Sequence, residues 1–103
     1  MKTIEKLSRM IEEELEDSEK YIKCAIKYKN ELPTLSKSFY DLSLAEMGHV
    51  NVLHTEVTRL IEEHRRKVGE PPAAMLAVYN YLHEKQIEEA HEIKMWQEEY
   101  RNA

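Results

Sequence analysis

A glutamate and a histidine lie three positions apart, as Glu46 and His49, inside the apolar stretch LAEMGHVNVL. In a helix this spacing puts both side chains on one side, one turn apart. Because an unpaired buried carboxylate costs several kcal/mol, a counter-charge or a metal ion should accompany Glu46. The pair is therefore a candidate functional site.

Two further acids fall on the apolar sides of their own segments, at Glu14 and Glu89. When neighbouring helices are reflected through their turns, both acids come level with position 51, at the helical rise of about 1.5 Å per residue. His49 is two residues from that level and Glu46 is one turn beyond it. Four candidate metal ligands, Glu14, Glu46, His49 and Glu89, therefore converge on one layer.

Carboxylates and neutral imidazoles on helices suit iron, manganese or zinc. The single cysteine, Cys24, excludes an intramolecular disulfide and any cysteine-ligated cluster. Only two glycines are present, so no glycine-rich phosphate loop is expected. Nothing indicates a nucleophilic serine or cysteine. The sequence favours metal chemistry over acyl or phosphoryl transfer.

A second pair with the same spacing, Glu88 and His91, occurs in EEAHEIKM. It could replace Glu89 as the contribution of the third helical segment. The helical periodicity turns this pair roughly opposite the apolar side, toward solvent or a partner subunit. Both assignments stay open, with Glu89 preferred.

The composition predicts a single all-α domain over residues 1–103, since Gly and Pro total only five and Glu, Lys, Leu and Ile abound. Apolar residues recur with helical spacing in three segments, at about residues 3–31, 34–67 and 73–101. Short connections make consecutive helices antiparallel neighbours. We expect a three-helix bundle.

Local signals set these boundaries. Thr3 and Thr34 are candidate N-caps, and Pro33 disfavours helix at the residue before it. Gly69 is suited to the position just after a helix, and the two prolines that follow favour a stop and a new start.

The apolar side of the second segment is predicted to enter the core through Leu35, Phe39, Leu42, Leu53, Val57 and Leu60. A second apolar side of the same segment, made of Tyr40, Leu44 and Met47, lies outside this set. It predicts an interface in a homo-oligomer.

These residues resemble the ferritin-like di-iron carboxylate superfamily, in particular its rubrerythrin and bacterioferritin branch, across roughly residues 3–101. The resemblance is carried by the spacing of Glu14, Tyr21, Glu46, His49, Leu53 and Glu89. It implies iron as the cofactor, two ions per site, with manganese or zinc possible. It also implies oxidase, peroxidase or ferrous-iron oxidation activity, with the three glutamates and His49 as ligands.

The family's bundle takes one Glu from each of two helices and a Glu-x-x-His pair from each of the other two. This sequence holds three helical segments, and VGEPP is too short for the family's long crossover. We therefore expect a second chain to complete a four-helix type of bundle, in a homodimer or larger homo-oligomer. The alternative function is a non-catalytic oligomerisation or adaptor module that keeps such a core without metal.

The net charge of −5 argues against nucleic acid as a partner, because no basic stripe offsets the twenty acids. No apolar run is long enough to cross a bilayer, so no membrane partner is expected. The start of the sequence has no signal-peptide pattern, and a cytoplasmic location is expected.

Overall fold

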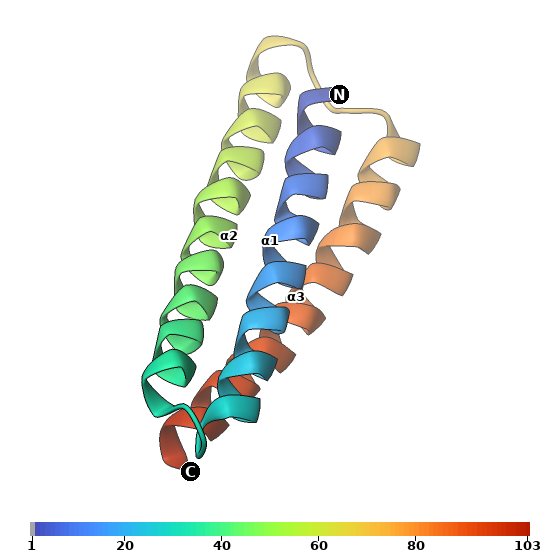
Figure 1. The fold of residues 1–103 in the computed structure, drawn as a ribbon. Coiled ribbons are helices and arrows are strands. Elements are labelled where there is room, and N and C mark those ends of the chain that lie inside the picture. Colours follow the sequence, from blue (N-terminus) through green and yellow to red (C-terminus); the bar gives the residue numbers. More distant parts are fainter. Residues whose placement is uncertain (1) are drawn as a thin grey trace.

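Three long antiparallel helices make up the computed structural model, which describes residues 2–103 (Figure 1). They are α1 (Lys2–Tyr28), α2 (Pro33–Lys67) and α3 (Ala73–Asn102). No strand occurs among these residues, and the bundle measures 56 × 19 × 18 Å. The all-α, three-helix prediction is confirmed.

The first turn differs in detail from its prediction. α1 ends at Tyr28, not near residue 31, and the Leu32 N–H donates to the Tyr28 carbonyl at 2.9 Å. Pro33 begins α2, and the residue before it has the non-helical angles φ −134° and ψ 70°. Thr34 therefore lies inside α2 and is not its N-cap, because the proline fixes the start one residue earlier. Thr3 likewise lies inside α1 and does not cap it.

The second turn follows the glycine prediction. Gly69 has φ 117°, a conformation that favours glycine, and its N–H donates to the His64 carbonyl at 3.2 Å. α2 stops at Lys67 and α3 starts directly after Pro72. The chain reverses here within five residues, which keeps α2 and α3 antiparallel.

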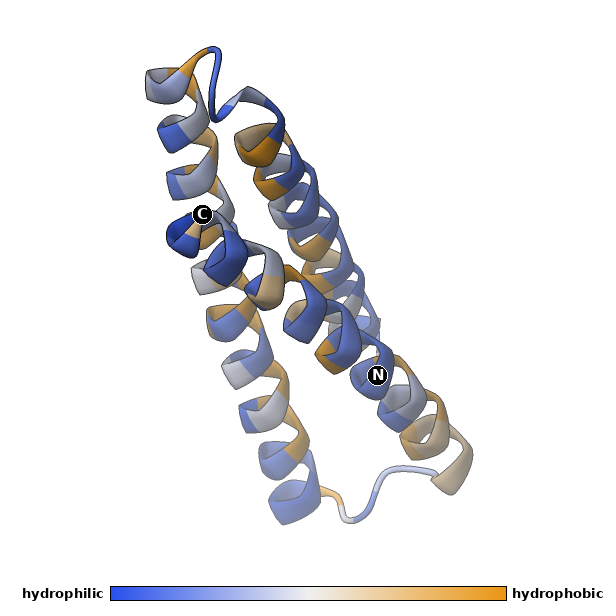
Figure 2. Cartoon of the chain, turned by 90° about the horizontal axis from the view of Figure 1, so that it is seen from below, coloured by the Kyte–Doolittle hydropathy of each residue, from blue (hydrophilic) through white to orange (hydrophobic). Residues whose placement is uncertain are grey.

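The core lies mainly between α1 and α2, which pack together along most of their length. Leu15, Ile22, Val57 and Ile93 are completely buried. The hydrophobic residues of α1 and α2 lie mainly on the sides that face the rest of the bundle (Figure 2), whereas α3 also exposes several, among them Val78 and Ile87. Removal of this apolar surface from water is the main stabilising contribution, roughly 25 cal/mol per Å².

The buried side of α2 agrees with its prediction in part, since Val57 is buried and Phe39, Leu53 and Leu60 pack against the core. Tyr40 and Met47 are buried, so they belong to the core and do not form the predicted oligomer interface. Leu35 and Leu42, predicted in the core, are instead 42% and 44% exposed. The reason is that α3 reaches α2 on the Tyr40 side and leaves the leucine side uncovered.

α3 packs mainly against α1 and meets α2 chiefly toward its own C-terminal end (Figure 1). There Tyr100 stacks on Tyr40 at 4.7 Å between ring centroids, and its hydroxyl is 3.0 Å from Ser36 Oγ. Arg101 donates to the Tyr40 hydroxyl at 2.9 Å. The beginning of α3 stands away from α2.

Small polar residues fill the places where the helices approach most closely. Ser18 Oγ donates to the Ser43 carbonyl at 2.8 Å, and Ser43 Oγ donates to the Ser18 carbonyl at 2.9 Å. Gln97 Nε2 donates to Ser43 Oγ at 2.9 Å, and Gln86 Nε2 donates to Ser8 Oγ at 3.1 Å. These buried side chains fix the register of the three helices through satisfied hydrogen bonds.

Candidate metal centre

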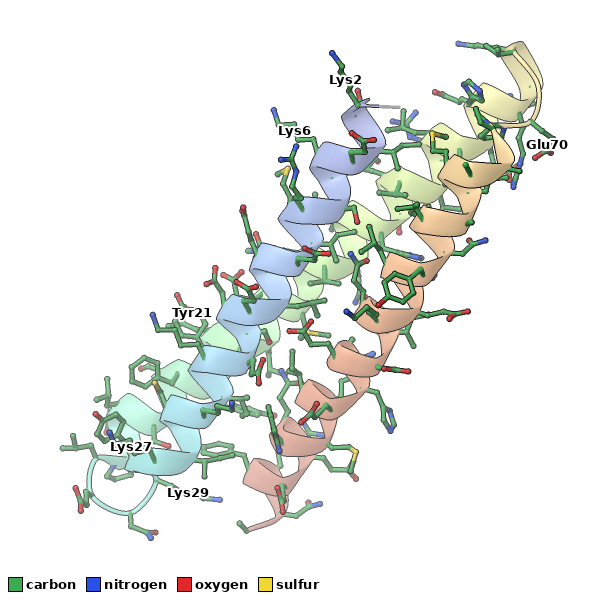
Figure 3. The ribbon with its side chains drawn as sticks, turned by 90° about the vertical axis from the view of Figure 1, so that its right-hand side faces the viewer. Lys2, Lys6, Tyr21, Lys27, Lys29 and Glu70 are labelled. Atoms are coloured by element: carbon green, nitrogen blue, oxygen red, sulfur yellow. The ribbon has the colours of Figure 1, made fainter. Side chains whose placement is uncertain are left out.

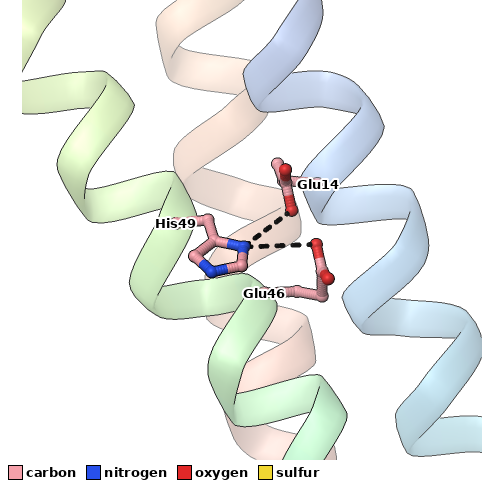
Figure 4. Close-up of side chains that lie close together, drawn as sticks. All are labelled: Glu14, Glu46 and His49. Carbon is pink, nitrogen blue, oxygen red and sulfur yellow. Dashed lines mark hydrogen bonds and ion pairs between the residues drawn. The ribbon is translucent and has the colours of Figure 1, made fainter.

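Three of the four predicted ligands come together on the seam between α1 and α2 (Figure 4). Each of Glu14, Glu46 and His49 offers an atom that lies within 4.8 Å of those of the other two. His49 Nδ1 is 3.4 Å from Glu14 Oε2 and 3.8 Å from Glu46 Oε2. The group, called here the carboxylate trio, has the residue types that bind iron, manganese or zinc.

Glu46 is the unusual member of the trio. Its Oε2 atom is buried and has no hydrogen-bond partner among residues 2–103. His49 Nδ1, at 3.8 Å, is too far away to donate a hydrogen bond to it. A buried carboxylate oxygen without a partner is costly, and a bound cation is one physical explanation for it.

Helical spacing explains how the trio assembles. Glu46 and His49 are one turn apart on α2, and Glu14 meets them from α1 because Ser18 and Ser43 lock the two helices in register. Solvent reaches the trio through His49, whose side chain is 59% exposed, while Glu46 is only 17% exposed. The trio is thus closed on its inner side and open on its outer side.

The trio lies on the flank of the α1–α2 pair that α3 does not cover. Aromatic rings on the same flank pack between the helices, with Tyr21 stacked on Phe39 at 6.2 Å. Tyr21 is on the side of α1 away from α3 (Figure 3). The leucine side of α2 continues this flank through Leu35 and Leu42. This uncovered surface is called here the outer flank. It consists of partly exposed apolar residues that surround the carboxylate trio.

Glu89 lies elsewhere, in a groove between α1 and α3 lined by Glu12, Glu16, Leu82, Lys85 and Gln86. Burial raises the pKa of Glu89, and the nearby acids, Glu19 first, raise it further. Glu12 and Glu16 are each two residues from Glu14, which is about 200° around a helix. Glu89 therefore does not reach the trio. It faces the side of α1 opposite Glu14, so agreement in height along the bundle was not enough.

The alternative pair on α3 also stays apart from the trio. Glu88 and His91 are both exposed. His91 lines a groove of about 340 Å³ between α2 and α3, together with His54 and His83. The structure brings neither of the two candidate acids of α3, Glu88 and Glu89, to the carboxylate trio within one chain.

The sequence interpretation missed the contact between His54 and His83. Their Nε2 atoms are 3.3 Å apart, and their rings stack at 4.5 Å between centroids. A signal was present, because reflection of α2 and α3 through residues 68 and 72 puts position 54 level with position 86, one turn from His83. The same comparison of heights that aligned the acids therefore also predicts a contact between these two histidines.

No protein-family model, curated protein or solved structure matches this chain. Among residues 2–103, no helix has the length and apolar character needed to cross a membrane.

Proposed function

We propose that this protein binds a divalent cation of the iron or manganese class through Glu14, Glu46 and His49, as a ferritin-like helical protein. The observation that supports this most is the buried, unpartnered Oε2 of Glu46. A cation would satisfy that oxygen and would offset the repulsion between the two neighbouring carboxylates. Zinc is the other metal that suits this donor set.

Each side chain has a distinct part in this proposal. Glu14 and Glu46 supply negative charge from two different helices, and His49 supplies a nitrogen at the solvent-facing edge. Three protein donors leave coordination positions open for small molecules. Bound iron would supply redox chemistry toward dioxygen or peroxide, which is the oxidase, peroxidase or iron-oxidation activity that the ferritin-like resemblance implies.

We further propose that a second copy of this chain covers the outer flank. Leu42 is 44% exposed and Met10 is 38% exposed, and they stand one helical turn before Glu46 and Glu14, respectively. A two-fold arrangement would place two trios close together, giving four carboxylates and two imidazoles for two ions. This would supply the ligands that one chain lacks and would complete a bundle of four-helix type.

The metal proposal is tested by binding Mn²⁺ and Fe²⁺ to the full chain after metal removal, with Fe²⁺ titrated under anaerobic conditions. Glu46→Gln and Glu14→Gln should each weaken binding by about tenfold or more. Glu13→Gln is the matched control, since Glu13 is exposed and neighbours Glu14. Equal affinities for all four proteins, or no binding by the unaltered chain, would contradict the proposal.

The oligomer is tested by light scattering on the same protein. Leu42→Lys places a charge on the outer flank and should shift the mass toward one chain. Val52→Lys is its control, because Val52 is 63% exposed on the same helix, on the side turned away from the core. A single-chain mass for the unaltered protein would exclude the second copy.

The non-catalytic module is the second candidate, and the 3.4 Å approach of His49 Nδ1 to Glu14 supports it. A protonated His49 would give the acids a counter-charge without metal. Glu46→Ala separates the two functions by its melting temperature. A metal ligand predicts a loss of stability only in the metal-loaded protein, whereas a structural role predicts the same loss with and without metal.

A further inference from the structure

The contact between His54 and His83 joins α2 to the first half of α3, away from the carboxylate trio. The two Nε2 atoms are 3.3 Å apart, and the rings are nearly parallel, with 14° between their planes. Tyr79 also stacks on His83, at 5.8 Å between ring centroids, so two aromatic rings hold this imidazole in place. Two basic nitrogens from two helices therefore lie against each other.

The two nitrogens stand at 3.3 Å as a hydrogen-bonded pair, one imidazole donating to the other, and this contact brings two donor atoms close enough to bind one ion once their rings turn. Two imidazole nitrogens bound to one tetrahedral zinc ion at about 2.0–2.1 Å stand about 3.3–3.4 Å apart. We propose that His54 and His83 form a second cation site, which takes zinc or a similar borderline transition ion. The near-parallel rings must each turn about the Cβ–Cγ bond so that both lone pairs point at the ion, and χ2 of histidine is a soft torsion.

The surroundings of His83 favour its neutral form, which is the form of imidazole that binds metal. Burial lowers the pKa of His83, and the neighbouring His54 lowers it further, while Glu84 acts weakly in the other direction. The groove beside the pair is lined by Asn51, Gln86, His91 and Lys94 as well as apolar residues. Its volume of about 340 Å³ leaves room for water at the remaining coordination positions.

The donor chemistry separates this site from the carboxylate trio. Two imidazoles without a carboxylate suit zinc, copper or nickel better than manganese, whose preferred ligands are oxygens. A zinc ion here would tie the first half of α3 to α2, in a region where the two helices otherwise make few contacts. The site therefore predicts zinc-dependent stability that is independent of the trio.

The test uses the full chain carrying Glu46→Gln and His49→Ala, so that the trio no longer contributes. Zinc chloride is titrated by calorimetry at pH 7.5, and the melting temperature is measured with and without zinc. We expect binding of one zinc per chain and a rise in melting temperature. His83→Gln and His54→Gln should each weaken binding by about tenfold or more. His64→Gln, a histidine elsewhere on α2, should change neither quantity.

Cobalt(II) gives a second readout that does not depend on stability. Strong visible absorption is expected when cobalt occupies a tetrahedral site, and it should disappear in His83→Gln. No zinc binding by the Glu46→Gln/His49→Ala chain would overturn the proposal, as would equal binding by the His83→Gln and His64→Gln variants. Neither result bears on the carboxylate trio, whose metal binding is measured separately in the chain with His54 and His83 intact.

Discussion

Two polar clusters of this bundle satisfy their hydrogen bonds very differently. In the serine cluster, Ser18 and Ser43 exchange hydrogen bonds with each other's carbonyls, and Gln97 donates to Ser43. In the carboxylate trio, Glu46 Oε2 is buried without any hydrogen-bond partner among residues 2–103. A complete set of partners indicates a role in structure, whereas a missing partner points to something that binds.

The largest effect on stability is expected in the serine cluster. Ser43→Ala removes the acceptor of Gln97, whose side chain is almost fully buried, and the donor to the Ser18 carbonyl. The free energy of unfolding should fall by about 1–3 kcal/mol, because buried polar groups lose their partners. Urea denaturation measures it. Ser38→Ala on the same helix is the control, since Ser38 is exposed, and it should have almost no effect. Equal effects of the two substitutions would remove the contrast between the clusters.

A substitution in the carboxylate trio should not lower the free energy of unfolding when no metal is present. Glu46→Gln removes a buried charge and its repulsion with Glu14, so metal-free protein should keep its free energy of unfolding or gain up to about 1 kcal/mol. Urea denaturation with a chelator present checks this. A clear loss of stability would show that His49 already compensates Glu46 as a structural partner, and would favour the non-catalytic module.

The smallest effect is expected at Glu89, which lies apart from both clusters. Its pKa is raised in the folded protein, so the ionised form opposes folding. This destabilisation is present above the raised pKa and disappears below the ordinary value of the unfolded chain, about 4.3. Glu89→Gln should therefore raise the melting temperature slightly at pH 7, with the difference vanishing below about pH 4.

Glu88→Gln is the matched control for that measurement, because Glu88 is exposed on the same helix. It should not change the melting temperature at either pH. If Glu89→Gln instead lost metal affinity as strongly as Glu46→Gln, Glu89 would belong to the metal site after all, as the sequence predicts.

The two proposed cation sites extend the same comparison. The carboxylate trio has two carboxylates and an exposed edge, whereas the His54–His83 pair offers two imidazole nitrogens and has aromatic neighbours. Manganese should therefore report on the first site in the chain with His54 and His83 intact, and zinc on the second site in the Glu46→Gln/His49→Ala chain. Competition between the two metals for one site would contradict this division.

The sequence by itself determined the helices, their order and three members of the candidate site. Helical periodicity and the breaks at Pro33 and Gly69 are local properties, so they can be read without any knowledge of contacts. The pairing of Glu46 with His49 is also local, because one turn of helix fixes it. Glu14 could be added because a short turn fixes the level at which α1 and α2 meet.

Only the tertiary structure decided which side of each helix is covered. The orientation of α2 buries Tyr40 and Met47 in place of Leu35 and Leu42, because α3 and the small serines determine how closely the helices approach. The position of α3 also sends Glu89 to the opposite flank and brings His83 to His54. The height of a residue along the bundle follows from the lengths of the helices and turns. The direction in which its side chain points depends on the packing of all three helices.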